Sequence, residues 1–210
     1  MARRALFGTL ALACCALLGV GATIGAGDYL SAPARSTVGA PPPSLHASPV
    51  SIPTLGGPIA GWLAPGARSA SRAGSVLLLH GVRGNRLQML GRAQFLARLG
   101  YSVLLIDLQA HGESAGDHIT FGAREVAGVT AALDYLERVR PGEPIGVIGS
   151  SLGAAAVVLA RPGKRIGALV IEAMYPTIDE AVQNRLTMYG ARRPGCWRRC
   201  CCSRCRCAWM

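Results

Sequence analysis

The sequence predicts an α/β fold, in which helices cover both faces of a mainly parallel sheet. Continuous apolar runs end at His80 and Asp107, and a third run stops at Gly149. Such runs are typical of strands that are buried on both faces. A helical pattern follows each run, at a spacing that fits right-handed crossovers between parallel strands. Because ligands of these sheets bind beyond the carboxyl ends of the strands, the residues that end the runs are the first candidates for a site.

The remaining elements follow from apolar periodicity and from glycine and proline stop signals. Residues 87–99 carry an apolar stripe at helical spacing, and residues 121–140 are amphipathic. We expect helices at 87–99 and 121–140, a helix in the Ala-rich segment that ends at 161–163, a helical start at 178–186, and further strands at 59–63 and 166–172.

A glycine-flanked serine lies where the third run meets the Ala-rich segment. Only Gly149-Ser150-Ser151-Leu152-Gly153 fits the pattern G-x-S-x-G, so Ser151 rather than Ser150 is the candidate nucleophile. Small flanking residues let a sharp strand-to-helix turn close and expose the hydroxyl. The N–H of Leu152 can then face a developing oxyanion. The alternative is a strand-to-helix junction that serves packing only.

A glycine-bearing loop follows the run that ends at His80. Its sequence, His80 to Asn85, places the backbone N–H of Val82 where it can face the same oxyanion as Leu152. For His80 itself, we expect a structural role, in which the ring holds the loop.

With these motifs, the chain resembles the α/β-hydrolases of the serine esterase, lipase and peptidase-like branch. The resemblance rests on Leu-Leu-His-Gly-Val at 78–82, on Asp-Leu-Gln-Ala-His-Gly-Glu-Ser at 107–114 and on the elbow at 149–153. It covers residues 50–189, the first two thirds of such a domain. It implies an α/β-hydrolase-type fold that is incomplete at its C-terminal end, with Ser151 as nucleophile, the Val82 and Leu152 N–H groups as oxyanion hole, and no cofactor or metal.

The chain departs from the family in its general base. The family's order is serine, then acid, then histidine. No histidine follows Ser151, and the acidic residues that do follow come too early to be the family's acid. The histidines are His46, His80, His111 and His118, and the acidic residues are Glu172, Asp179 and Glu180. Whether the chain is an enzyme is therefore uncertain, because loss of the base removes most of the rate enhancement.

The N-terminal part predicts a membrane or export segment. Residues 5–27 are uncharged and mostly apolar, long enough to span a bilayer, and two arginines precede them. We favour an uncleaved anchor at 1–30 that places the domain outside the cytoplasm, over a cleaved signal peptide that would export it. Residues 31–51, rich in Pro, Ala and Ser, are expected to form an extended linker or a loop wrapped on the domain at 52–189.

The tail at 190–210 has six cysteines and six arginines but no acidic residue. It accounts for over half of the formal charge of +11, so the charge does not indicate a nucleic-acid surface in the domain. Cys202 and Cys205 form one C-x-x-C pair, whereas a zinc site needs two pairs with a loop between them. A frameshift or truncation near residue 190 explains the composition best.

The leading hypothesis is therefore an α/β-hydrolase that cleaves an ester or amide of a small molecule or peptide through an acyl-enzyme on Ser151, impaired for want of a histidine. The second is a catalytically inactive, membrane-associated binding module on the same fold. The third is a defective product that does not accumulate folded, since a final apolar edge strand would favour aggregation.

Overall fold

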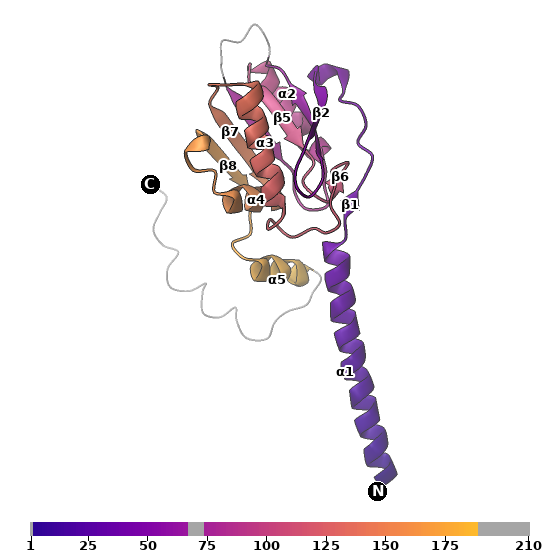
Figure 1. Ribbon diagram of the computed structural model, residues 1–210. Helices are drawn as coiled ribbons and strands as arrows, with labels where there is room; N and C mark the ends of the chain where they lie inside the picture. The colour runs from indigo at the N-terminus through magenta and orange to yellow at the C-terminus, as the bar shows by residue number, and fades with distance from the viewer. Residues whose placement is uncertain (1, 67–73, 189–210) are drawn as a thin grey trace, which may run out of the picture. The chain divides into compact units, whose positions relative to one another are not determined.

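The computed structural model describes residues 2–66 and 74–188. Six strands form the main sheet, in the order β2-β3-β5-β4-β7-β8 (Figure 1). β3 is antiparallel to both of its neighbours, β2 and β5, whereas the other neighbouring strands pair in parallel, so the sheet is mainly parallel. The strands are β2 (Ser48–Ile52), β3 (Ile59–Ala64), β4 (Ser75–Leu79), β5 (Ser102–Ile106), β7 (Ile145–Ser150) and β8 (Ala168–Glu172).

Helices lie on both faces of this sheet because the central strands alternate their side chains between two apolar clusters. In β4, Leu77 and Leu79 join one cluster with residues of α3 (Glu125–Val139) and α4 (Leu152–Ala160). Leu78, one position along, packs in the other cluster with residues that include Ala93 of α2 (Leu90–Arg98). Successive side chains of a strand point to opposite faces of the sheet. Because both faces of the central strands are buried, their sequences are unbroken apolar runs.

Two helices begin later than their periodicity predicts. A 3-10 turn at Arg86–Met89 precedes α2, and its Asn85 cap accepts a hydrogen bond from the Leu87 N–H. The helix expected from residue 121 starts at Glu125, because Phe121 and Gly122 both have positive φ. The Glu125 carboxylate accepts the N–H of Gly122 and so stabilises the non-helical residues before α3.

The segment expected as a linker packs against the domain, which agrees with the alternative of a loop wrapped on its surface. β1 (Ala34–Arg35) pairs with β6 (His111–Gly112), and the 2 %-exposed Leu45 belongs to the cluster on the α2 face. An extended linker over the whole of 31–51 is wrong, because most of β2 lies within it and pairs with β3.

Residues 7–27 of the N-terminal helix α1 (Ala2–Ser31) include no charged residue. Residues Phe7–Ser31 have a mean hydropathy of 2.0 and none of the window is buried. By length and composition this helix could cross a membrane, although a signal sequence would have the same properties.

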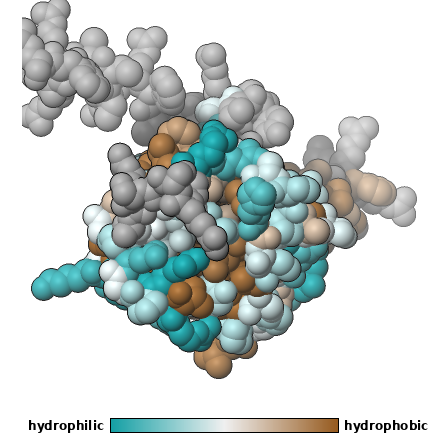
Figure 2. Space-filling model, turned by 90° about the horizontal axis from the view of Figure 1, so that it is seen from above, coloured by the Kyte–Doolittle hydropathy of each residue, from teal (hydrophilic) through white to brown (hydrophobic). Residues whose placement is uncertain are grey.

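Apolar side chains are also exposed on β8, the edge strand of the sheet. Leu169, Val170 and Ile171 are between 39 % and 47 % exposed. By contrast, hydrophilic residues are interspersed with apolar ones over the face seen in Figure 2, as on an ordinary protein surface.

The residues from Tyr175 onward form a separate compact unit. Its helix, α5 (Ile178–Met188), is capped by Thr177, whose hydroxyl accepts a hydrogen bond from the Glu180 N–H at 3.1 Å. The predictions for the cysteine-rich tail at 190–210 lie outside the described residues.

Candidate active site

Ser151 occupies a strained turn between β7 and α4. Its φ of 49° and ψ of −107° lie in a region that residues other than glycine rarely adopt. Such strain persists only where the surroundings enforce it, and it is concentrated at functional sites. The side chain is half-buried, and its hydroxyl has no hydrogen-bond partner among the residues that the structure describes.

The glycines on either side of Ser151 are required by close packing. A Cβ on Gly149 would lie 2.7 Å from the backbone N of Ala154. A Cβ on Gly153 would lie 2.6 Å from the Leu79 Cβ and 2.7 Å from the Leu79 O. The start of α4 therefore approaches β7 and β4 so closely that no side chain fits between them.

The loop after β4 lies against this turn. The Gly153 N–H donates to the His80 O at 3.1 Å, and a Cβ on Gly81 would lie 3.6 Å from the Ser151 Cβ. On the other side, the Ser151 N–H donates to the Glu172 O at 2.8 Å, which ties the turn to β8. The predicted nucleophile and the predicted oxyanion loop are therefore neighbours.

Within this loop, the N–H groups on both sides of Val82 are already used. The Gly81 N–H donates to the Gln88 Oε1, and the Arg83 N–H donates to the His111 Nε2, both at 3.0 Å. Across the described part of the chain, neither the Val82 N–H nor the Leu152 N–H has a hydrogen-bond partner. Leu152 begins α4, and a first helical N–H has no partner within its helix.

Both histidines near the site have structural roles in which neither ring nitrogen is free. His80 is buried; its Nδ1 pairs with the Gly81 O at 2.7 Å, and its Nε2 accepts the Leu108 N–H at 2.9 Å. Burial lowers the pKa of His80 to about 3, with the charges of His111 and Arg86 acting in the same direction. His80 is thus a neutral ring held between two loops.

His111 is bound in the same way. Its Nδ1 pairs with the Gln109 O at 2.8 Å while its Nε2 accepts from Arg83. Burial lowers the pKa of His111, although the carboxylates of Glu125 and Asp107 oppose the shift. The two remaining histidines, His46 and His118, are exposed. Among the described residues, no imidazole is hydrogen-bonded to the Ser151 hydroxyl.

The carboxylates near the site are engaged elsewhere. Asp107 accepts from the Arg86 N–H and guanidinium and from the Glu113 N–H, and burial raises its pKa. Glu113 pairs with Arg86 and accepts the N–H of Gly39. The hydrogen bond from Gly39 is the main cause that lowers the pKa of Glu113 to about 2. These contacts hold the loops together and leave neither carboxylate free to act as an acid.

Glu172 is also paired. Its carboxylate binds Arg92 of α2 at 2.5 Å. Asp179 and Glu180 belong to the separate unit from Tyr175 onward and are described only within it.

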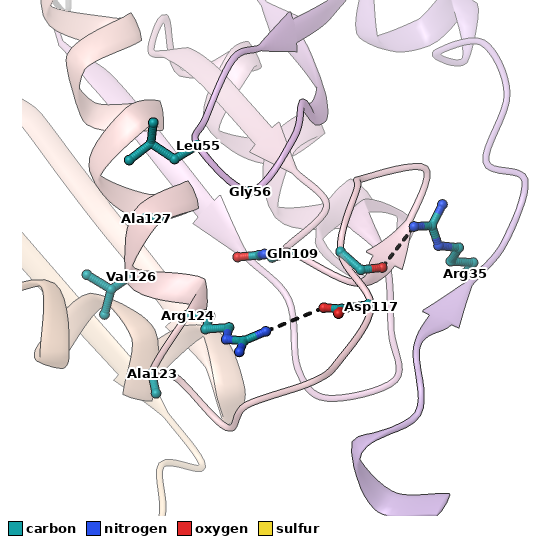
Figure 3. Close-up of a pocket in the computed structure, with 10 residues that line it drawn as sticks. Arg35, Leu55, Gly56, Gln109, Asp117, Ala123, Arg124, Val126 and Ala127 are labelled. Carbon is teal, nitrogen blue, oxygen red and sulfur yellow. Dashed lines mark hydrogen bonds and ion pairs between the residues drawn. The ribbon is translucent and has the colours of Figure 1, made fainter. Parts of the chain in front are cut away.

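The pocket in Figure 3 is distinct from the Ser151 turn. Gln109, Arg124, Asp117 and Arg35 contribute polar groups to it, beside the apolar Leu55 and Val126. Ser151 is not among the residues that line it. This pocket is therefore not the site to which the sequence motifs point.

Sequence reasoning missed two residues that build the site. Arg86, just before the helix predicted at 87–99, was given no role, yet it is 2 % exposed and its guanidinium lies 4.7 Å from the centroid of the Trp62 ring. Gln88 gave no signal, because a lone glutamine seven residues from its partner matches no motif. The available clue was Asp107, since an acid that ends a buried strand needs a cationic partner.

The chain belongs to the alpha/beta hydrolase family, whose model matches residues 76–199. An esterase from Pyrococcus furiosus is 28 % identical, with a TM-score of 0.65 over 75 % of this chain and 64 % of that one. The chain therefore spans less than two thirds of that esterase. None of the curated proteins compared with the chain matches it.

Two further structures share the fold. An α/β serine hydrolase without a lid from Xanthomonas campestris is 18 % identical, with a TM-score of 0.53 over 60 % of each chain. A putative α/β-hydrolase from Agrobacterium tumefaciens is 24 % identical, with a TM-score of 0.54 over 61 % of each chain.

Proposed function

We propose that Ser151 is the nucleophile of a site that hydrolyses an ester or amide, and that turnover is impaired because no imidazole serves it. The observation that carries this proposal is the strained backbone of Ser151 next to the loop after β4, together with the N–H groups of Val82 and Leu152, which have no hydrogen-bond partner among the described residues. The esterase from Pyrococcus furiosus supports an ester as the substrate class.

The acylation step follows from this arrangement. The Ser151 Oγ attacks the carbonyl carbon, and the oxyanion that forms accepts hydrogen bonds from the Val82 and Leu152 N–H groups. The bond to the leaving oxygen or nitrogen then breaks and leaves an acyl-enzyme, which water hydrolyses. The Ser151 proton must go to water or hydroxide, because no imidazole among the described residues is hydrogen-bonded to the hydroxyl to take the proton and return it to the leaving group.

This chemistry favours substrates whose leaving group needs no proton. A p-nitrophenyl ester releases a stable anion, whereas an alkyl ester or amide needs general acid catalysis. We therefore expect acylation by p-nitrophenyl esters and little turnover of alkyl esters. The rate is expected to rise with hydroxide concentration, without the plateau that a titrating histidine gives.

The test compares p-nitrophenyl butyrate hydrolysis by the full chain, Ser151→Ala and Ser150→Ala in detergent. Ser150 is a matched control, because it precedes the nucleophile and also lies at the end of β7. Loss of the reaction in Ser151→Ala alone supports the proposal. Equal rates in Ser151→Ala and the full chain contradict it and favour the inactive binding module on the same fold.

We also propose that α1 anchors the domain to a membrane, with the domain outside the cytoplasm. Support comes from the apolar residues 7–27 of α1, which include no charged residue, and from Arg3 and Arg4, which precede them. Carbonate extraction of membranes from expressing cells tests this proposal. The protein is expected in the pellet at full length; a shortened protein in the soluble fraction indicates a cleaved signal and export.

A further inference from the structure

Two buried histidines join the loops after β4 and β5 reciprocally. His80, at the start of the first loop, accepts the N–H of Leu108 in the second. His111, in the second loop, accepts the N–H of Arg83 in the first. The two rings meet edge to face, with centroids 5.1 Å apart, and both side chains are fully buried. Each loop thus supplies the acceptor that the other needs. We call His80, His111 and these two hydrogen bonds the clasp.

The Arg83 end of this clasp lies in strained backbone. Arg83 has a φ of 57°, a left-handed conformation that favours glycine. It sits in a tight turn closed by the Gly84 N–H, which donates to the Gly81 O at 3.2 Å. A long, unbranched residue holds this conformation only where its surroundings enforce it. The hydrogen bond to His111 is the contact that fixes the Arg83 N–H.

We propose that His111 is a positioning residue for the oxyanion hole, which holds the turn in the one arrangement that leaves the Val82 N–H free and facing Ser151. The proposal rests on the proposed function, because it assigns a task to the same site. Gln88 fixes the N–H before Val82, and His111 fixes the N–H after it. Val82 is therefore the only member of this three-residue stretch whose N–H is left for a ligand.

The clasp requires that both rings stay neutral. Each Nε2 accepts a hydrogen bond, so a proton there would remove the acceptor. Burial lowers the pKa of both rings, which keeps the acceptors available near neutral pH. The charged groups that act on the clasp are Arg86 beside His80, and Glu125, Asp107 and Arg83 beside His111.

A role in positioning differs from a role in folding alone, and three variants of the full chain separate the two. His111→Leu removes the acceptor, whereas His111→Gln keeps an oxygen that can accept from Arg83. Ser114→Ala is the matched control. Its hydroxyl is equally buried in the same loop and accepts the Ala60 N–H, but it makes no hydrogen bond to the described residues 81–84.

The readout is the rate at which a fluorophosphonate labels Ser151, measured together with the melting temperature. Loss of one oxyanion donor typically costs about a hundredfold or more in rate. His111→Leu is expected to label about a hundredfold more slowly, and His111→Gln to recover most of the rate. Ser114→Ala is expected to melt earlier but label normally. Unchanged labelling in His111→Leu, or an equal loss in Ser114→Ala, overturns the proposal.

If the unmodified chain is not labelled, the proposed function fails, and amide hydrogen exchange then tests the clasp by itself. Protection of the Arg83 amide is expected to fall in His111→Leu and to persist in Ser114→Ala. Protection that persists in His111→Leu overturns the positioning role, because Arg83 would then be fixed without His111.

Discussion

Replacing Gly153 with alanine tests how tightly the turn at Ser151 is packed. The added Cβ would lie 2.6 Å from the Leu79 Cβ, 2.7 Å from the Leu79 O and 2.8 Å from the His80 O. Carbon atoms normally approach to about 3.5–4.0 Å, so the first contact is short by roughly 1 Å. Two of the three contacts are with backbone of β4 and its loop, which cannot move without disturbing the sheet.

The cost belongs at the upper end of the range for overpacking, about 3 kcal/mol. For a domain of this size, that loss lowers the melting temperature by roughly 10 °C. Gly146→Ala in β7 is the control, because a Cβ there would meet its nearest atom, the Val76 Cγ2, at 3.8 Å. This is an ordinary contact, and removal of a glycine from the unfolded chain stabilises by about 0.4–1 kcal/mol.

The assay is thermal unfolding of the full chain in detergent, followed by circular dichroism, with fluorophosphonate labelling of each variant. We expect Gly153→Ala to melt far below the unmodified chain and to lose labelling, and Gly146→Ala to melt at or above it with labelling intact. If the two variants are equally stable and equally labelled, the close packing of α4 on β4 does not set the turn, and our account of it is wrong.

Other predictions concern the charged and titratable groups around the loops. Arg86→Met leaves the buried Asp107 carboxylate without its cation and is expected to cost about 3–5 kcal/mol in urea unfolding. Arg92→Met breaks the more exposed pair with Glu172 and should cost under about 1 kcal/mol, so equal losses would refute the distinction. The pKa of His80 is lowered to about 3 in the folded state, whereas it is about 6.5 in the unfolded state. Below about pH 6.5, the unfolded state therefore binds more protons than the folded state. The free energy of unfolding should therefore fall by roughly 2 kcal/mol between about pH 6.5 and pH 5, and a flat urea-unfolding profile over that range would contradict this sign.

The central part of the fold could be predicted because its signals are local. β4, β5 and β7 read as unbroken apolar runs, and their two buried faces explain why. The Ser151 turn could be placed because two glycines at fixed spacing are needed where α4 meets the sheet. In these segments, the neighbouring residues determine both the backbone and the packing.

Other parts could not be predicted because their partners lie far along the chain. Residues 48–51 of β2 were assigned to a linker because the segment 31–51 is rich in Pro, Ala and Ser, and Ile52 alone in this strand is buried. An edge strand tolerates proline because the N–H groups on its outer side need no partner strand. The other side of β2 pairs with β3, and this pairing could not be seen in the sequence. Arg86 and His111 are likewise explained by contacts with the opposite loop, which no spacing in the sequence reveals.

The account depends most directly on the reactivity of one serine hydroxyl. Mass spectrometry of peptides from the fluorophosphonate-treated full chain locates the covalent adduct. We predict that the adduct lies on Ser151 and remains there in Ser150→Ala. An adduct on another residue, or none even at reagent concentrations and times far beyond those that label a known serine esterase, would contradict the assignment of Ser151 as the nucleophile.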